Sequence, residues 1–307
     1  MKVKTYESFL VAEEHQGLTV EYYLKKILGY SGRKIQKLTR AKGILLNNKS
    51  VFLQKKVKAG DQLKILLLQD KSYGVVPEQG AVQILYEDPE IVVVNKPARM
   101  LVHPAGRTEH GTLANYLAYY FQQKKEVLTI RPLHRLDRDT TGCVVFAKKA
   151  EIQSALERQL KQGQFKRIYW ALVPGRVEPP AGEIELPLGP DDFKPNRRTV
   201  KEQGERAVTR YRTLKTEIIP DLSLEVSLLE LDLITGKTHQ IRVHLAHIGH
   251  PVLGDRMYGK PFPLISRQAL HARTVSFIHP ASGQKVTFQA PWPEDLQKII
   301  NLDEKNN

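Results

Sequence analysis

The chain has 307 residues, of which 41% are hydrophobic and 26% charged, a composition typical of globular proteins with a substantial core. Its formal net charge is +14 and its pI is about 9.6, an excess of positive charge that favours a polyanionic partner. The single cysteine, Cys143, excludes an intramolecular disulfide and a zinc site built from cysteines. The chain shows neither a signal peptide nor an apolar run of about 20 residues, so we expect a cytoplasmic protein without a membrane segment.

The first 72 residues carry most of the net positive charge, with 15 Lys and Arg against 6 Asp and Glu. Apolar residues recur at helical spacing over residues 18–29, and a second helix is predicted to follow and to end at Gly43. The second helix has Ile35 and Leu38 on one side, and on the other side the basic residues Arg33, Lys34, Lys37 and Arg40. Acidic residues are missing from the basic side, which we therefore expect to be unpaired and positive.

Short strands are predicted at residues 44–46 and 62–68, after the two helices. Two small helices and a hairpin, with a basic second helix, resemble the S4 RNA-binding domain. The resemblance implies that residues 1–72 form an S4-like α/β domain and that its basic helix binds RNA. Residues 73–80 contain Pro77 and two glycines and are predicted to be a linker.

The remaining residues, 81–302, predict one larger domain of mixed strands and helices, followed by a disordered tail at 303–307. The pattern favours an α+β fold with a mixed or antiparallel sheet. Strands are expected at 91–96, 143–147, 165–173, 204–214 and 222–231, and helices at 112–122 and 150–162. Residues 174–200, which are rich in proline and include Arg197 and Arg198, are predicted to be a long connection with an embedded hairpin that touches the ligand.

One stretch of this domain, His134 to Gly142, is the strongest candidate for a reactive site. It places Asp137 between Arg135 and Arg138, just before a Thr-Thr-Gly sequence that predicts a loop and an apolar run that predicts a buried strand. Loops held by buried strands often carry reactive groups. The neighbouring positive charges favour an ionised Asp137. An ionised carboxylate is suited to act as a nucleophile or a base, and poorly suited to donate a proton.

This stretch resembles the signature of the RluA-type RNA pseudouridine synthases, whose catalytic aspartate falls at Asp137. The segment Arg167-Ile168-Tyr169 resembles the second family motif, although Arg167 stands where lysine is more usual. The segment Thr235 to Leu245 resembles the third motif. With further matches near residues 91–104, 254–259 and 270–293, the resemblance covers essentially the whole chain.

The resemblance implies an isomerase that converts selected uridines in structured ribosomal or transfer RNA to pseudouridine. It assigns catalysis to Asp137, with Arg242 as its ion-pair partner and Tyr169 stacked on the target base. Arg135 and Arg138 would contact RNA. Because substrate and product contain the same atoms, no cofactor and no metal are needed, and a monomer is expected. Three routes stay open for Asp137: attack on the sugar, attack on the base, or removal of a proton. The RNA, the uridine and the number of target sites also stay open, as does whether the basic helix sets specificity or only affinity.

Three other interpretations of these residues deserve comparison. His239, His244, His247 and His250 suggest a metal site, but no pair has the His-x-x-x-His spacing of a helical zinc site. Asp137 and Asp139 suggest a glycosidase, but nothing in the sequence keeps one of them protonated as that mechanism requires. A non-catalytic S4-domain RNA-binding or assembly factor is the competing function, and the presence of Asp137, Tyr169 and Arg242 together argues against it.

Overall fold

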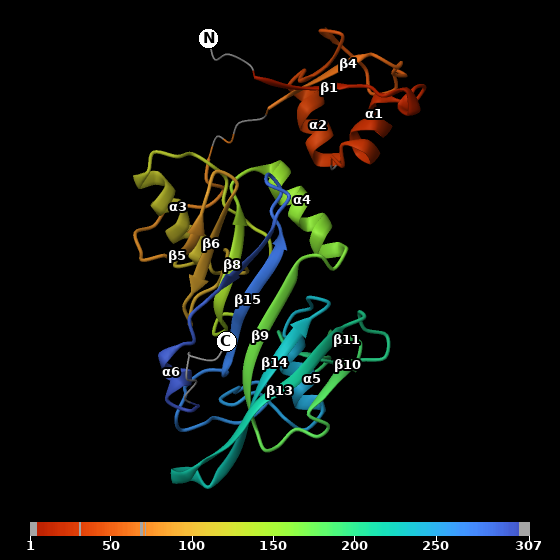
Figure 1. The fold of residues 1–307 in the computed structure, drawn as a ribbon. Helices are drawn as coiled ribbons and strands as arrows, with labels where there is room; N and C mark the ends of the chain where they lie inside the picture. Colours follow the sequence, from red (N-terminus) through yellow and green to blue (C-terminus); the bar gives the residue numbers. More distant parts are fainter. Residues whose placement is uncertain (1–4, 31, 68–69, 71, 301–307) are drawn as a thin grey trace. The chain divides into compact units, whose positions relative to one another are not determined.

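A computed structural model describes residues 5–30, 32–67, 70 and 72–300, without the side chain of Arg33. The tail predicted at 303–307 lies outside these residues. The chain divides into two compact units, Met1–Lys71 and Ser72–Asn307 (Figure 1). Within the described ranges, no helix is long and apolar enough to cross a membrane.

The N-terminal unit packs its helices on a four-stranded antiparallel sheet with the order β1-β4-β2-β3. Its strands are β1 (Tyr6–Leu10), β2 (Ile44–Leu46), β3 (Lys49–Ser50) and β4 (Gln62–Leu66). Alternate residues of β4, Leu63 and Ile65, are buried together with Ile35 and Leu38 of helix α2 (Gly32–Arg40). The predicted apolar side of this helix therefore faces the core.

The first predicted helix, over residues 18–29, is shorter and irregular. It consists of α1 (Val20–Tyr22) followed by the π-helical turn Tyr23–Ile27. The Thr19 side chain accepts a hydrogen bond from the amide of Tyr22 and so caps the start. Strand β1 was not predicted, because its exposed side chains outnumber its buried ones and leave little apolar pattern.

The second unit is built on a ten-stranded sheet whose main path has the order β10-β13-β14-β9-β15-β8-β6-β5 (Figure 1). Its pairs are antiparallel except for β8 and β15, which are parallel. The fold is therefore α+β with a mixed sheet, as predicted. The strands are β5 (Gln83–Glu87), β6 (Ile91–Lys96), β7 (Arg131–Pro132), β8 (Thr141–Ala147), β9 (Lys166–Pro174), β10 (Ala181–Glu185), β13 (Val208–Ile219), β14 (Leu224–Leu233), β15 (Leu270–Ile278) and β16 (Lys285–Gln289).

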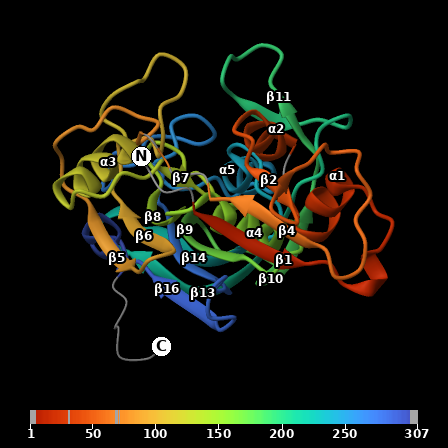
Figure 2. The same cartoon turned by 90° about the horizontal axis from the view of Figure 1, so that it is seen from above.

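Helices and chain segments cover both faces of this sheet at β6 and β8. Val92 and Val94 pack with α3 (Leu113–Gln123), and the alternating residues Ile91 and Val93 pack with α4 (Ala150–Lys161). All seven residues of β8 are buried, which explains why its sequence is a continuous apolar run. Helix α5 (Gln240–His247) shares the core of α3 and lies on the same side of the sheet, as Figure 2 shows, while the short α6 (Glu294–Gln297) adds Leu296 to this core.

Several predicted boundaries move in the structure. Strands β13 and β14 lie a few residues further along the chain than 204–214 and 222–231. The hairpin expected within 174–200 is formed by β11 (Leu188–Pro190) and β12 (Arg198–Val200). The segment predicted as a linker is bonded to the second unit, since the Glu78 amide donates to the carbonyl of Asn115 in α3 at 3.1 Å.

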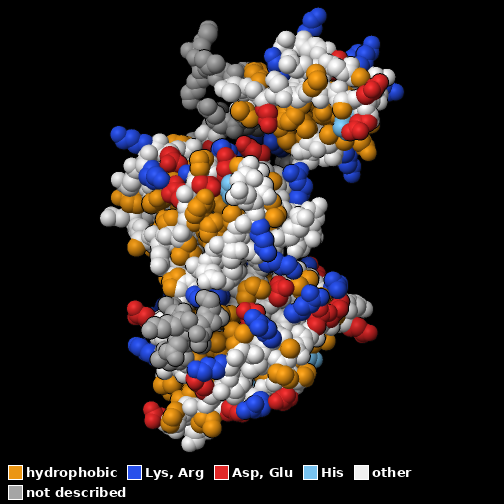
Figure 3. All heavy atoms as spheres, viewed as in Figure 1, with side chains coloured by type: hydrophobic (Ala, Val, Ile, Leu, Met, Phe, Trp, Pro, Cys, Tyr) orange, Lys and Arg blue, Asp and Glu red, His pale blue; other side chains and the backbone are white. Residues whose placement is uncertain are grey.

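Many exposed cations of the second unit have acidic partners. Arg210 Nε lies 2.6 Å from Glu183, and Arg212 Nε lies 2.7 Å from Glu230, both across the β10-β13-β14 strands. Figure 3 shows Lys and Arg side chains interspersed with Asp and Glu on one face of this unit. Such exposed pairs add little stability, but they balance much of the charge of the second unit.

Candidate active site

Asp137 lies in the loop between β7 and β8, and this loop is held from several directions. The amide of Thr140 donates to the carbonyl of Asp137 at 3.2 Å and closes a turn. Arg267 donates to the carbonyl of Asp139 at 3.3 Å, and the amide of Arg99 donates to the Asp139 carboxylate at 3.1 Å. The position of Asp137 is therefore fixed by contacts of its own carbonyl and of Asp139. Asp139 serves these contacts and does not line the cavity in front of Asp137, which removes the second carboxylate of the glycosidase interpretation.

A fully buried lysine, Lys96, supports the same loop from beneath. Its ammonium donates to the carbonyls of Pro97 at 2.7 Å, Met100 at 2.8 Å and Arg138 at 2.9 Å. Burial lowers the pKa of Lys96 to about 7, while the charges of Asp139 and Asp137 act in the opposite direction. Because three carbonyls use all three N–H groups, this geometry belongs to the charged ammonium.

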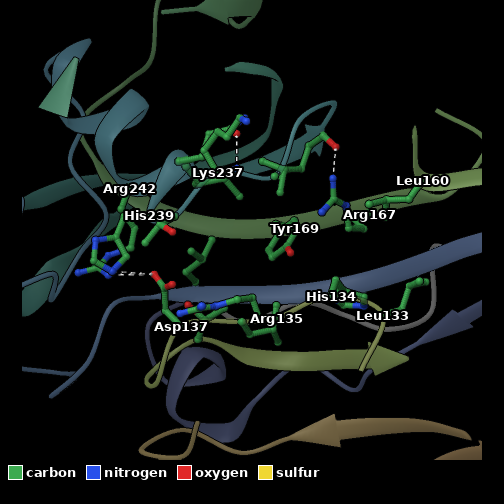
Figure 4. Close-up of a pocket in the computed structure, with 18 residues that line it drawn as sticks. Leu133, His134, Arg135, Asp137, Leu160, Arg167, Tyr169, Lys237, His239 and Arg242 are labelled. Atoms are coloured by element: carbon green, nitrogen blue, oxygen red, sulfur yellow. Dashed lines mark hydrogen bonds and ion pairs between the residues drawn. The ribbon is translucent and has the colours of Figure 1, made fainter. Parts of the chain in front are cut away.

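Arg242 joins two carboxylates from its place on α5. Its Nη1 donates to Asp137 Oδ2 at 2.9 Å, which is the contact expected from the sequence. Its Nε and Nη2 bind Asp255 at 2.6 and 2.9 Å in a bidentate pair (Figure 4 shows the contact with Asp137). Burial opposes the charge of Arg242, but the hydrogen bonds and charge of Asp255, together with Asp137, raise the pKa of Arg242 well above its usual value. Arg242 is therefore a permanent cation beside Asp137.

Asp255, the second partner of Arg242, is completely buried and was given no role from the sequence. It also accepts the amides of Met257 and Tyr258 at 2.9 and 3.1 Å. Burial disfavours its charge, yet Arg242 and these two amides bring the pKa of Asp255 below the usual value. Asp255 thus stays ionised and orients the guanidinium that Asp137 uses.

Tyr169 projects from the centre of β9 toward the same cavity as Asp137 (Figure 4). Its side chain is buried, and burial raises the pKa of Tyr169 to about 12, so the phenol is neutral at physiological pH. The cavity has a volume of about 260 Å³ and brings together residues from the loop before β8, from β9 and from the start of α5. Its polar lining includes His134, Arg135, Asp137, Arg167, Tyr169, Lys237, His239 and Arg242.

Arg167, in the second motif, shapes this cavity rather than the protein surface. It is buried on β9, and its Nη2 donates to the carbonyl of Leu233 at 3.2 Å. A side chain at Gly236 would begin 2.7 Å from the Arg167 guanidinium, so the glycine of the third motif makes room for this arginine. The sequence alone gave no sign of this contact, because it joins two motifs that are far apart along the chain.

The remaining predicted RNA-binding residues are scattered. Arg135 is exposed and lines the cavity, whereas the exposed Arg138 does not line it. In the N-terminal unit, Lys34 lies over the ring of Tyr30, and Lys37 and Arg40 are exposed on α2. The side chain of Arg33 lies outside the described part of the structure. The structure therefore unites Arg135 with Asp137, Tyr169 and Arg242, and it places the basic helix in a separate unit.

Known proteins share both units of this chain. Residues 90–247 match the RNA pseudouridylate synthase family, and residues 8–63 match the N-terminal domain of the ribosomal pseudouridine synthase RluD. The RNA pseudouridine synthase YhcT of Bacillus subtilis is 39% identical over 290 residues, covering 94% of this chain and 95% of the relative. Ribosomal large subunit pseudouridine synthase D of Nitrosomonas europaea is 36% identical over 309 residues, covering 95% and 87%.

The solved structure of human RNA Pseudouridylate Synthase Domain Containing 1 superimposes with a TM-score of 0.57 at 25% identity, and the match covers 71% of this chain and 89% of that one. The family match over residues 90–247 includes the loop of Asp137, strand β9 and all of α5. The chain belongs to the RNA pseudouridylate synthase family and is an isomerase that forms pseudouridine in RNA.

Proposed function

We propose that the chain modifies uridines of ribosomal RNA from the large subunit, with Asp137 as the catalytic carboxylate. The observation that carries the catalytic assignment is the ion pair between Asp137 and Arg242 inside a cavity that Tyr169 also lines. The choice of RNA is supported by relatives named for the large ribosomal subunit, which are 33–36% identical over most of this chain.

The reaction breaks the bond from C1′ of the ribose to N1 of the base and joins C1′ to C5 of the same base. C5 then loses its proton, and N1 gains one, so the atoms balance without a second reactant. All three routes open to Asp137 require its ionised form, for which Arg242 supplies an ion-pair partner at 2.9 Å. The detached base has to be retained and kept from water, and the buried ring of Tyr169 lines the cavity that would hold it.

Three neighbouring groups have defined parts in this proposal. Tyr169 stacks on the target base from the β9 side. Arg242, itself oriented by Asp255, holds Asp137 in place. Arg135, exposed at the cavity and adjacent to the reactive loop, contacts the RNA from which the base has been turned out. The N-terminal unit, which resembles the S4 domain, adds affinity through its basic helix.

The Asp137→Asn variant tests the catalytic assignment and the substrate together. The amide keeps the shape of the side chain but cannot attack or accept a proton, so turnover should fall by at least about 10⁴-fold. RNA affinity should stay close to the parental value. The measurement is a chemical-labelling map of pseudouridine in RNA from cells that lack the gene and are supplied with each form.

The matched control is Asp139→Asn, which removes a charge outside the cavity and keeps a side-chain oxygen that can accept the Arg99 amide. Sites in large-subunit ribosomal RNA should disappear without the gene, return with the parent and with Asp139→Asn, and stay absent with Asp137→Asn. Full recovery with Asp137→Asn would exclude Asp137 as the catalytic group. Loss of sites only from transfer RNA would refute the choice of substrate.

A further inference from the structure

His239 places an imidazole in the cavity beside Asp137, in a conformation that few residues other than glycine adopt. It is the N-cap of α5, with φ 59° and ψ 16°, in the left-handed region. Histidine tolerates this region better than most residues, yet such conformations persist mainly where the surrounding structure enforces them. Its side chain is only 14% exposed, and its Nε2 lies 3.9 Å from Asp137 Oδ2. The strained backbone therefore positions the imidazole against the catalytic carboxylate (Figure 4).

The hydrogen bonds around Tyr258 favour a neutral imidazole whose proton is on Nε2. The backbone amide of Arg198, at the start of β12, donates to the Tyr258 hydroxyl oxygen at 2.8 Å. The same hydroxyl lies 2.9 Å from His239 Nδ1. A hydroxyl has one proton, and donating it to Nδ1 is the arrangement in which both groups are satisfied. Neutral His239 then carries its proton on Nε2, the nitrogen that faces the cavity.

Within the described residues, this Nε2–H group donates no hydrogen bond. Asp137 Oδ2 is too distant for a hydrogen bond, and no other acceptor within hydrogen-bond distance of Nε2 is found among residues 5–30, 32–67, 70 and 72–300. The group lines the cavity that receives the base. A positioned donor of this kind, free until the substrate arrives, is the arrangement by which enzymes stabilise charge that develops during reaction.

We propose that His239 is a second catalytic residue, whose Nε2–H donates a hydrogen bond to a carbonyl oxygen of the uracil as the bond from C1′ to N1 breaks. The proposal rests on pseudouridine formation at Asp137. The electron pair of the broken bond leaves with the base and spreads over its ring nitrogen and carbonyl oxygens. His239 keeps its proton throughout, so the proton balance of the reaction is unchanged. The donor acts on the base while Arg242 acts on the carboxylate.

The charges around His239 are compatible with a neutral imidazole. Burial lowers the pKa of His239, and the cations Arg242 and Arg198 act in the same direction. The carboxylates of Asp137 and Asp255 act in the opposite direction and do not reverse the shift. Tyr258, the remaining group that faces the ring, is neutral because burial raises its pKa. His239 is thus an uncharged donor at physiological pH and does not compete with Arg242 for Asp137.

Two substitutions distinguish the role of His239 as a hydrogen-bond donor from a role in the fold. In His239→Asn, the amide reaches the position of Nδ1, tolerates the left-handed backbone and can keep the contact with Tyr258, but no donor reaches the position of Nε2. Its single-turnover rate should fall about 100-fold, as for other lost donors to a developing anion, with RNA affinity close to parental. In His239→Gln the longer side chain carries its amide N–H to the Nε2 position and should restore most of the rate.

A substrate with a better leaving base distinguishes a catalytic from a structural role. In RNA with 5-fluorouridine at the target position, fluorine withdraws charge from the departing base. The rate at which this substrate is consumed should therefore fall much less in His239→Asn than the rate with uridine does. An equal loss on both substrates, or a parental rate for His239→Asn, would overturn the proposal for His239. Asp137→Asn is assayed in parallel, since turnover by that variant would instead refute the proposed role of Asp137, on which this inference depends.

Discussion

At the scale of single residues, the site depends on one arginine that serves two acids. Arg242 uses Nε and Nη2 for the fully buried Asp255 and has Nη1 left for Asp137. Asp137 receives one hydrogen bond from Arg242 and is 21% exposed at its side chain. Asp255 therefore orients the guanidinium, and the guanidinium holds Asp137. Part of the Asp137 carboxylate stays accessible to substrate.

Replacing Arg242 by Met should destabilise the protein and abolish activity for different reasons. At pH 7, the buried Asp255 would lose its counter-charge, at a cost of about 3–5 kcal/mol in the free energy of unfolding. In the parent, the lowered pKa of Asp255 makes its contribution complete above the unfolded pKa of about 3.9 and lost as the pH falls through the folded value. In the variant, burial without Arg242 raises the pKa of Asp255. Acid therefore protonates the Asp255 carboxylate and removes the cost of an unpaired buried charge. The difference in the free energy of unfolding between the parent and Arg242→Met should therefore decrease as the pH falls.

Urea unfolding of both proteins at pH 7 and in mild acid measures this difference. The double variant with Arg242→Met and Asp255→Asn is the control, because it removes the buried charge together with its partner. It should recover much of the stability but none of the activity. A difference in the free energy of unfolding that stays constant with pH would show that the unpaired Asp255 does not cause the loss of stability.

The sequence predicted the residues that carry a motif, and it did not predict those that act through another residue. Asp137, Tyr169 and Arg242 were named from their motifs, and they meet at one cavity. Lys96 contacts only backbone carbonyls, one of them 42 residues away, and such contacts leave no pattern in the side chains. Asp255 was seen only as part of a matching segment. Its role follows from burial against Arg242, which a sequence does not record.

At the scale of elements, the Thr-Thr-Gly sequence shows how a correct location can come with a wrong reason. It predicted a loop before a buried strand, but Thr141 and Gly142 already belong to β8 and pair with β15. Gly142 has φ 113°, and a side chain there would begin 2.2 Å from the carbonyl oxygen of Ala272. The glycine is required for the close approach of two strands, which is a long-range constraint, whereas turn propensity is local.

The basic side of α2 gives a prediction about a single element. Lys37 and Arg40 are exposed there, and replacing both by Gln should weaken RNA binding without slowing the turnover of bound RNA. Each lost contact with a phosphate of unpaired RNA reduces the slope of log affinity against log salt by about 0.7, so the slope should decrease by about 1.4. The measurement is RNA affinity at several salt concentrations, together with single-turnover rates at saturating enzyme.

A charge-matched control is available on β13. Replacing Arg210 and Arg212 by Gln changes the net charge equally, but both arginines are already paired with glutamates and should release few counterions. For this Arg210 and Arg212 double variant, the slope of log affinity against log salt should stay near the parental value. If both double variants lower the slope to the same degree, net charge alone accounts for the effect and α2 has no particular role.

At the scale of the whole molecule, the sequence foresaw the fold class and the concentration of charge in the first 72 residues. It did not reveal that the sheet of the second unit has a buried core on each of its faces at β6 and β8. Periodicity records which side chains are apolar, and a strand buried on both faces has no alternation that would assign them to one core or the other.

The thiol of Cys143 should report the opening of the second unit. It is completely buried in β8, in the core that packs against α4, and burial raises its pKa to about 12. Alkylation in native buffer should therefore be slow and limited by unfolding, and added urea should accelerate it. Arg242→Met should react faster, by about tenfold for each 1.4 kcal/mol lost from the free energy of unfolding, whereas the Lys37 and Arg40 double variant should match the parent. Fast reaction of the parent in native buffer would show that the β8 region opens locally.

The burial of Cys143 also determines how this thiol responds to oxidative stress. Oxidants act on accessible thiolates, and the chain has one cysteine, which it keeps protonated and covered while folded. Peroxide or disulfide compounds should then leave the thiol of working molecules untouched and react with those that have already opened. Oxidation of Cys143 would place a polar, bulkier group in a closed core and prevent those molecules from refolding. Oxidation of this thiol would thus fall selectively on chains that had already lost their function.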